Sequence, residues 1–398
     1  MKILVVEDDK VTRMVMEKHL RDWMYDVVSA GTGAEGWDRF LEHKDEIRLV
    51  LMDWVLPGGS GLDLCRRIKE ISRDGFVYVI MCTGIDKAEG IITAMEAGAD
   101  DYMVKPIRPS ELKVRLMAAR RLLELQRRLE TNNRRLTEAN RELREDLVIA
   151  SRMQETLLPT CLPETRRVTF SRKFIPGHFV SGDVYDVFRL DDDHLGMYLV
   201  DVCGHGVKAA MASTVVHSTL SLDLRRTQIL RAPIAGSNCR FRINPPHKVI
   251  SELAHALPIY HQISFFTMFY GVLNLADGSF SYSSAGHPPA LLLRKDGRYT
   301  WLRQGGVPVG ISHDAKYESG TIRLEPGDAV FLYSDGVCEA TDPLGEQFGQ
   351  ARMLEPLLEG CDLPPDQILD RLLEAARSFA GENLHQDDLT LLHFRYDG

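Results

Sequence analysis

Acidic residues recur in this sequence where a short apolar run ends. Glu7 and Asp8 follow the run KILVV, and Asp53 follows LVLM. Thr83 ends the run YVIMCT, and Lys105 follows DYMV. Each run has the composition of a β-strand, and the runs alternate with helix-like patterns, which is typical of a parallel sheet. The carboxyl ends of parallel strands meet at one edge, so we expect these five side chains to share a pocket.

The carboxylates of this first group predict a metal site. Clustered carboxylates with no soft ligand among them favour a hard divalent cation such as Mg²⁺, which also relieves their mutual repulsion. A single aspartate at a strand end is equally well explained by turn formation. The prediction therefore depends on the whole set and on its order along the chain.

A second group of aspartates lies in the C-terminal half, again beside apolar runs and small residues. Its members are Asp183 in SGDVYD, Asp201 in VDVCGHG, Asp335 in YSDGV, and Asp387 and Asp388 in HQDDLTLL. Neighbouring glycines allow the backbone to approach an ion closely. Four or five oxygen ligands suit a pair of Mg²⁺ or Mn²⁺ ions, and such a pair can activate a bridging water and clamp a phosphoryl group. We predict that Asp201 bridges the two ions.

Three regions of different character position these two groups. Residues 1–120 alternate strands with amphipathic helices, which predicts an α/β doubly wound domain with a five-stranded parallel sheet. Residues 121–158 are rich in arginine and glutamate and predict a helical linker. Residues 159–398 contain strand-like runs separated by Gly and Asp turns, which predicts an α+β domain. Helices in this last region are expected after Gly206, around 247–257 and around 366–379.

The linker prediction depends on a leucine repeat. The leucines are Leu122, Leu129, Leu136, Leu143 and Leu157, with Ala150 at the missing step. Apolar residues every seven positions form the seam of a coiled coil, and Pro159 ends the helix. Because a seam needs a partner, we expect a parallel homodimer that carries a signal between the domains. A passive solvated helix that only spaces the domains is the alternative.

Charge and composition exclude several classes of function. The net charge of −9 disfavours a nucleic-acid partner, because phosphate binding needs a basic face. The chain has no apolar run of about 18 residues, and its N-terminus is acidic where a signal peptide is basic, so we expect a cytoplasmic protein that binds no membrane. The seven cysteines include no CxxC pair, which argues against a disulfide framework and a zinc site.

Residues 1 to about 120 resemble the receiver domain of two-component response regulators. The resemblance is carried by Glu7-Asp8, Asp53, Thr83 and Lys105-Pro106 in this order and spacing. It implies that Asp53 is the phosphoacceptor, with a sensor histidine kinase or phosphotransfer protein as partner. A carboxylate can attack phosphorus in line while cations neutralise the charge on the phosphoryl oxygens.

The same resemblance implies roles for the residues around Asp53. Asp8 with Glu7, Asp53 and the Val55 backbone would hold Mg²⁺. Lys105 would pair with the phosphoryl group, Thr83 would be the switch hydroxyl, and Tyr102 would be the aromatic residue that moves with it. The Lys105–Pro106 bond is expected to be cis.

Residues 147 to 398 resemble the SpoIIE/RsbU-like branch of the metal-dependent (PPM) protein serine/threonine phosphatases. The motifs are ASRMQETLLP, SGDVYD, DVCGHGVKAAM, FFTMFYGVLNLADGSFSYSSAGHPPALLL, GGVPVGI, LEPGDAVFLYSDGVCEATD, GEQFG and DDLTLL. The resemblance implies a β-sandwich flanked by helices and a two-metal centre. In it Asp201 bridges two Mg²⁺ or Mn²⁺ ions and the Val202 carbonyl binds one of them. Asp183, Asp335 and Asp387 complete the shells, and Asp388 is a weaker candidate.

Two departures from this family lie close to the predicted ligands. Ser181 stands where the family usually has glycine, and Cys203 stands where it usually has serine. Both replacements are small and neither removes a ligand, so we expect activity to survive. His205 could be a general acid or a turn residue, and His287 is interpreted as structural. Arg172 and Lys173 are the nearest cations upstream of Asp183, but we assign them to the surface. Residues 223–247 fit the family pattern poorly.

Together the resemblances imply a response regulator in which phosphorylation of Asp53 controls a phosphoprotein phosphatase. The family suggests a phosphoserine anti-sigma-factor antagonist as substrate. The alternative is a catalytically inactive adaptor that displays a phosphatase-like domain to a partner such as a sigma factor. The complete set of predicted ligands favours the enzyme.

Overall fold

The protein is described by a computed structural model that covers all residues except 73–75, 85–87, 221–228, 234–240, 258–264, 313, 361–362 and 386. The chain divides into two compact units, Met1–Arg141 and Glu142–Gly398, which are described one at a time. In the part of the chain that the structure covers, no helix is long and apolar enough to cross a membrane.

The first unit contains a five-stranded parallel sheet with the strand order β2-β1-β3-β6-β7. The strands are β1 (Lys2–Val6), β2 (Asp26–Ala30), β3 (Ile47–Asp53), β6 (Tyr78–Thr83) and β7 (Asp101–Val104). A small hairpin, β4 (Val55–Leu56) and β5 (Gly59–Ser60), follows β3. The predicted doubly wound fold with its five-stranded parallel sheet is confirmed.

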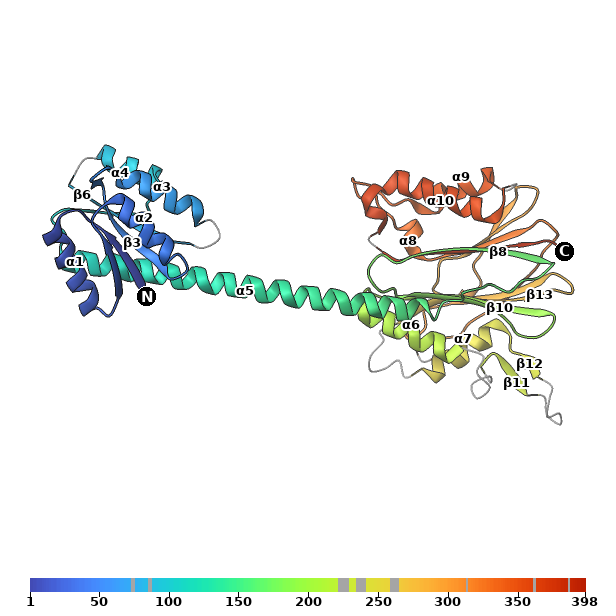
Figure 1. The fold of residues 1–398 in the computed structure, drawn as a ribbon. Helices are drawn as coiled ribbons and strands as arrows, with labels where there is room; N and C mark the ends of the chain where they lie inside the picture. The colour runs from blue at the N-terminus through green and yellow to red at the C-terminus, as the bar shows by residue number, and fades with distance from the viewer. Residues whose placement is uncertain are drawn as a thin grey trace. The chain divides into compact units, whose positions relative to one another are not determined.

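Helices cover both faces of this sheet (Figure 1). They are α1 (Lys10–Asp22), α2 (Gly33–Glu42), α3 (Gly61–Ile71), α4 (Ala88–Glu96) and the first part of α5 (Pro109–Glu155). Apolar side chains of α1 and α5 pack on one face, and those of α2, α3 and α4 pack on the other. Both faces of every central strand are therefore buried, which explains why the strand sequences are apolar throughout.

Helix α5 begins at Pro109, so it continues through residue 120 without a break. It ends at Glu155, and Leu157 therefore lies beyond the helix that was predicted to include it. Helical residues with a seven-residue spacing remain exposed: Leu122 is 49%, Leu129 59%, Leu136 63% and Leu143 57% exposed. Because these side chains lie in solvent in a single chain, the coiled coil stays a prediction. The domain boundaries 1–120, 121–158 and 159–398 also stay predictions.

The second unit is a β-sandwich of two mainly antiparallel sheets. One sheet has the order β17-β14-β13-β10-β9, with β18 also paired to β14, and the other has the order β16-β15-β19-β20-β8. The strands are β8 (Val168–Ile175), β9 (Asp183–Arg189), β10 (His194–Val202), β13 (Phe266–Asn274), β14 (Ser279–Ala285), β15 (Ala290–Leu293), β16 (Tyr299–Leu302), β17 (Gly305–Gly306), β18 (Gly320–Arg323), β19 (Ala329–Tyr333) and β20 (Leu389–Tyr396).

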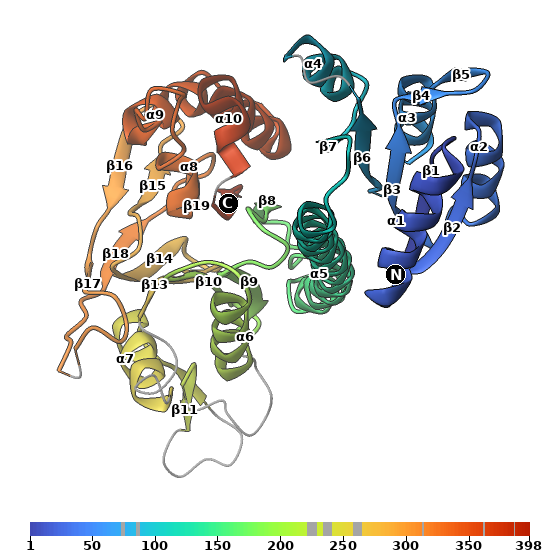
Figure 2. The ribbon, with the colours of Figure 1, turned by 90° about the vertical axis from the view of Figure 1, so that its left-hand side faces the viewer.

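Helices cover the outer face of each sheet in this second unit (Figure 2). Helices α6 (Val207–Leu220) and α7 (Pro246–Ala256) pack on the first sheet, and α9 (Gly349–Glu359) and α10 (Pro365–Ala380) pack on the second. Alternate strand residues fill a core between the sheets. The expected β-sandwich and the helices predicted after Gly206, around 247–257 and around 366–379 are confirmed.

Several shorter elements were not predicted. They are α8 (Asp335–Cys338), α9, the 3-10 helix η2 (Gly381–His385), and a hairpin formed by β11 (Arg231–Pro233) and β12 (Phe241–Ile243). The hairpin belongs to the segment 223–247, of which residues 223–228 and 234–240 lie outside the described residues. Helix α9 contains a buried proline, Pro356, which gives its sequence the pattern of an interrupted helix.

Candidate active sites

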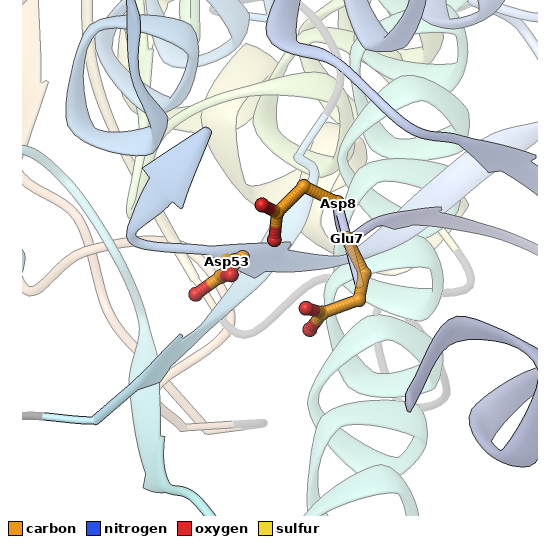
Figure 3. A group of neighbouring side chains, drawn as sticks. All are labelled: Glu7, Asp8 and Asp53. Carbon is orange, nitrogen blue, oxygen red and sulfur yellow. The ribbon is translucent and has the colours of Figure 1, made fainter. Parts of the chain in front are cut away.

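The first candidate site lies at the carboxyl edge of the parallel sheet. Glu7 and Asp8 follow β1, and Asp53 is the last residue of β3. Each offers a carboxylate oxygen, and these oxygens lie within 4.8 Å of one another (Figure 3). The Nζ atom of Lys105 lies 2.7 Å from Oε1 of Glu7 and 2.8 Å from Oδ2 of Asp53. The structure therefore brings together four of the five residues that the sequence placed in one pocket.

The electrostatics of this pocket depend on Lys105. Burial raises the pKa of Glu7 above its usual value, hydrogen bonding to Lys105 opposes this shift, and the charge of Asp53 adds to it. Burial lowers the pKa of Lys105, but its hydrogen bonds to Asp53 and Glu7 outweigh this effect and the net shift is upward. Lys105 therefore remains charged and neutralises part of the carboxylate cluster. A divalent cation would suit the remaining carboxylate oxygens.

The other predicted residues of the receiver pocket surround this cluster. Thr83 ends β6 and is 2% exposed, and its carbonyl accepts a hydrogen bond from the Lys105 amide. Val55 lies two residues after Asp53, at the start of β4, and its side chain is 67% exposed. The Lys105–Pro106 bond is cis, as expected.

Tyr102 lies on β7 and contacts the first part of α5. The guanidinium carbon of Arg115 on α5 lies 5.6 Å from the centre of the Tyr102 ring. Arg115 also forms an ion pair with Asp101, the neighbour of Tyr102 in the strand. Sequence reasoning missed Arg115, since an arginine on an amphipathic helix carries no signal of its own.

The second candidate site is built on one row of residues across three strands. Asp201 of β10 lies opposite Asp183 of β9 and opposite Thr267 of β13. Opposite residues in antiparallel strands point to the same face of the sheet. Leu199 precedes Asp201 by two residues and is packed between the two sheets, so the row also faces the second sheet.

The second sheet supplies the remaining aspartates. Asp335 is the first residue of α8, separated from the end of β19 by Ser334, and Asp387 and Asp388 directly precede β20. Strands β19 and β20 are hydrogen-bonded neighbours. Burial raises the pKa of Asp201 to about 8, and the charges of Asp335 and Asp387 add to this shift. All five predicted aspartates therefore lie on one side of the sandwich. Among these described residues, however, no three bring carboxylate oxygens within 4.8 Å of one another, as Glu7, Asp8 and Asp53 do in the receiver.

No cation neutralises these aspartates in the described part of the chain. Burial, Asp387 and Glu339 raise the pKa of Asp335 to about 6. Burial and Asp201 raise the pKa of Asp183 well above its usual value. Across the described ranges, neither lysine nor arginine forms an ion pair with any of the five. Such a cluster favours cation binding, because a nearby positive charge would offset both the burial and the mutual repulsion that raise these pKa values.

Two hydroxyl groups from the second sheet support Asp183, and sequence reasoning missed both. Thr390 Oγ1 donates a hydrogen bond of 2.5 Å to Oδ2 of Asp183, and Ser334 also hydrogen-bonds to this carboxylate. The Ser334 hydroxyl is itself held, because it accepts a hydrogen bond of 2.9 Å from the Thr390 amide. These hydroxyls fix the orientation of a carboxylate that is 1% exposed.

Asp387 and Asp388 differ in their surroundings. Asp388 is buried, and its carboxylate accepts hydrogen bonds from the amides of Gly177 at 2.9 Å and Gly182 at 2.6 Å. Asp387 is exposed and lies close enough to Asp201 and Asp335 to raise their pKa values. The carboxylate of Asp388 therefore holds the loop before Asp183. That of Asp387 accepts a hydrogen bond of 2.8 Å at Oδ1 from the neighbouring Asp388 amide and is otherwise exposed toward the acidic centre.

The end of α5 also contacts the loop before Asp183. The side-chain amide of Gln154 accepts a hydrogen bond of 2.9 Å from the Ser181 amide and donates one of 2.6 Å to the Ser181 carbonyl. It also lies 3.2 Å from the hydroxyl of Ser213 on α6. The Ser181 hydroxyl accepts a hydrogen bond from the Asp183 amide. The motif ASRMQETLLP contains Gln154, but the sequence did not show what its amide binds.

The remaining candidates lie around this centre. Val202 ends β10 next to Asp201, and Cys203 and His205 are exposed in the following turn. The ring of His205 contacts that of His178 edge to face, with centroids 5.0 Å apart. His287 is buried.

The two cations considered near Asp183 have other partners. Arg172 donates hydrogen bonds to the carbonyls of Pro159 and Thr160. Lys173 forms an ion pair with Asp370 of α10. Both side chains are therefore occupied in contacts that hold the domain together, and neither lies in the acidic centre.

Comparison with protein families identifies both units. The family model described as Stage II sporulation protein E (SpoIIE) matches residues 191–397, more than half of the chain. The chain belongs to the SpoIIE family. The model of the response regulator receiver domain matches residues 3–117. The protein is therefore a receiver domain followed by a SpoIIE-type phosphatase domain of the PPM class, as the sequence motifs indicated.

Individual relatives are similar over part of this SpoIIE-family chain. Protein IcfG of Synechocystis sp. is 29% identical over 252 residues, which cover 60% of this chain and 40% of IcfG. Phosphoserine phosphatase RsbU of Bacillus subtilis is 29% identical over 258 residues, covering 64% of this chain and 71% of RsbU. The chain thus spans about 40% of the length of IcfG.

The fold has a close counterpart among solved structures. The SiaA-PP2C domain of Pseudomonas aeruginosa superposes with a TM-score of 0.55 at 19% sequence identity. The match covers 65% of this chain and 99% of that domain. At this level of identity the likeness establishes the fold of the second unit.

Proposed function

We propose that this protein is a response regulator whose output is the metal-dependent hydrolysis of phosphoserine or phosphothreonine in a protein substrate. The observation that carries the proposal is the presence of five aspartates, without an ion-paired lysine or arginine in the described chain, on one side of the sandwich. The similarity to RsbU, a phosphoserine phosphatase, supports this substrate class. A phosphoserine anti-sigma-factor antagonist is the substrate we expect.

Four aspartates and one carbonyl would hold two Mg²⁺ or Mn²⁺ ions in the phosphatase centre. Asp201 would bridge the ions, and Asp183, Asp335, Asp387 and the Val202 carbonyl would complete the protein ligands. Bound ions of this kind lower the pKa of a water and neutralise phosphoryl oxygens. The chain's own contribution is to hold Asp183 in one orientation through Thr390 and Ser334.

In the receiver, Asp53 would accept a phosphoryl group. Its carboxylate oxygen forms a bond to phosphorus while the bond from phosphorus to the donor's leaving group breaks. Lys105, already 2.8 Å from Asp53, would neutralise charge on the transferred group. Glu7, Asp8 and the Val55 backbone would hold Mg²⁺ beside it, which would supply further charge neutralisation. A sensor histidine kinase or phosphotransfer protein is the expected donor.

Helix α5 offers a route by which Asp53 could control the phosphatase centre. Within the receiver, Tyr102 contacts Arg115 of α5, so a movement of Thr83 and Tyr102 would act on this helix. Within the second unit, Gln154 near the end of α5 binds both backbone groups of Ser181, two residues before Asp183. A rotation or shift of the helix would therefore reach a proposed metal ligand.

The principal test measures phosphatase activity of the purified full chain in Mn²⁺, with and without a small-molecule phosphoryl donor. We expect release of phosphate from candidate phosphoserine proteins, and a change in its rate when the donor is present. Asp53→Asn is the control: its intact mass should show no phosphoryl addition and its rate should not respond to the donor. If the Mn²⁺-saturated protein hydrolysed neither an aryl phosphate nor any phosphoprotein, the inactive adaptor would replace the enzyme.

We further propose that α5 forms a parallel dimeric coiled coil through its exposed leucines. Changing Leu129 and Leu136 together to Asp should shift the mass measured by light scattering from dimer to monomer and abolish control by phosphorylation. Changing Arg127 and Arg134 to Asp, on the same stretch of helix but off the leucine repeat, is the matched control. If the double leucine variant stayed dimeric and its phosphatase activity still responded fully to phosphorylation, the coiled coil would be neither the dimer interface nor the path of the signal.

A further inference from the structure

A buried histidine lies next to the row that carries Asp201. His287 is 6% exposed, and its Nδ1 atom lies 2.7 Å from the hydroxyl oxygen of Thr267. Thr267 stands directly opposite Asp201 across β10 and β13. The threonine therefore has the proposed metal-bridging carboxylate as its cross-strand neighbour and the imidazole as its hydrogen-bond partner.

The backbone around His287 is closely fitted. Gly286 has a φ of +64°, and a Cβ atom there would lie 2.2 Å from Cγ of Pro308, so only glycine fits. The hydroxyl of Ser284 donates a hydrogen bond of 3.1 Å to the His287 carbonyl. These contacts fix the backbone conformation at His287 and therefore the direction in which its imidazole points.

The imidazole also lies close to the second sheet. Burial lowers the pKa of His287 to about 3, and a contact with the Tyr333 backbone opposes this shift. Tyr333 is the last residue of β19, two residues before Asp335. The neutral imidazole of His287 thus lies between β13, where Thr267 is opposite Asp201, and β19, which precedes Asp335. A neutral imidazole adds no positive charge that would compete with a cation.

We propose that Thr267 and His287 are positioning residues that set the affinity of the phosphatase centre for its divalent cations. This inference rests on the proposed function. The imidazole holds the Thr267 hydroxyl in one orientation, and the hydroxyl in turn limits the positions open to the Asp201 carboxylate. Groups that orient metal ligands commonly change metal affinity by about 10- to 100-fold when they are removed.

The test uses Thr267→Val, which removes the hydroxyl but keeps the β-branched shape, and Thr267→Ser, which restores the hydroxyl. Titration calorimetry of the full chain with Mn²⁺ should show an affinity about tenfold weaker for Thr267→Val and close to wild type for Thr267→Ser. In EDTA, Thr267→Val should unfold at a lower temperature than Thr267→Ser, because it leaves Nδ1 of the buried His287 without its partner, so Mn²⁺ binding is compared at a temperature where both variants are folded. Thr321→Val, an exposed threonine on β18, is the matched control and should leave Mn²⁺ binding unchanged.

The outcomes separate this inference from the proposed function. If the wild type binds Mn²⁺ and Thr267→Val binds it equally well, the positioning role is wrong while the metal-dependent phosphatase stands. A wild type in which Mn²⁺ binds only to a site removed by Asp53→Asn would overturn both. His287→Gln should weaken Mn²⁺ binding in the same direction, and the Thr267 variants decide the question if that protein does not fold.

Discussion

The two acidic centres of this protein differ in the positive charge that the chain itself places beside the carboxylates. This difference determines how each centre behaves without a metal ion. In the receiver, Lys105 forms ion pairs with both Glu7 and Asp53. In the phosphatase centre, the described residues provide no such cation, and the pKa values of Asp201 and Asp335 rise to about 8 and about 6. The receiver thus carries part of its counter-charge in its own chain, whereas the phosphatase centre depends on bound cations for all of it.

The largest effect should follow from removing a proposed ligand in the centre that lacks a lysine. Asp201→Asn should lower phosphatase activity by more than about a hundredfold, because Asp201 is the proposed ligand of both ions, and Asp335→Asn should do the same because it removes a carboxylate ligand of the same centre. The measurement is phosphate release at saturating Mn²⁺. Asp296→Asn, in an exposed turn, is the control. Full activity in either variant would remove that aspartate from the proposed centre.

A smaller effect should follow from removing the lysine in the other centre. Lys105→Met leaves the fully buried Glu7 carboxylate beside Asp53 without a counter-charge, which should destabilise the receiver by about 3 kcal/mol in EDTA. Calorimetric unfolding of the full chain would measure this. Lys18→Met, an exposed lysine on α1, should change stability little. If Lys105→Met unfolded like the wild type in EDTA, the chain's own counter-charge would not stabilise the receiver.

The smallest effect concerns pH in the absence of metal. An aspartate with a pKa raised from 3.8 to about 8 keeps its proton in the native state at pH values where the unfolded chain has lost it. The native state therefore binds more protons, and the free energy of unfolding falls as pH rises from about 4 to 8. We expect a loss of about 2 kcal/mol between pH 6 and pH 8 for the second unit in EDTA.

Unfolding scans at these two pH values, with EDTA and with Mn²⁺, would measure this loss. Mn²⁺ should remove most of it, and Asp201→Asn should flatten the dependence in EDTA because it removes the main titrating group. The receiver transition should shift less in the same scans. A second unit that became more stable as pH rose in EDTA would contradict the comparison between the two centres.

The sequence was most informative where local chemistry and strand position coincide. Asp53 and Asp201 could be assigned because each belongs to a set of acids that recur at the ends of apolar runs in a fixed order, and because the motifs around them are long. The alternation of strands and helices also specified the doubly wound receiver. Helix α9 was missed, since Pro356 in its interior has the sequence signature of a helix break.

Other features could be recognised only in three dimensions. Thr390, Ser334 and Thr267 are hydroxyl residues in strand-like runs, where threonine is common for reasons of β-propensity alone. Gln154 lies on a polar helix, where glutamine is ordinary. Their partners are far away in the chain, as with Thr390 and Asp183, so no local pattern indicates the contact.

The sequence by itself determined the two domain types and the acids of each centre, because strand ends, turn residues and motif spacing are local properties. Only the tertiary structure decided which of two neighbouring carboxylates binds backbone amides from a distant part of the chain. Asp387 and Asp388 are adjacent and chemically identical, yet the amides of Gly177 and Gly182 engage Asp388 alone. That distinction arises from packing between residues about two hundred positions apart, where the burial of backbone amides requires an acceptor.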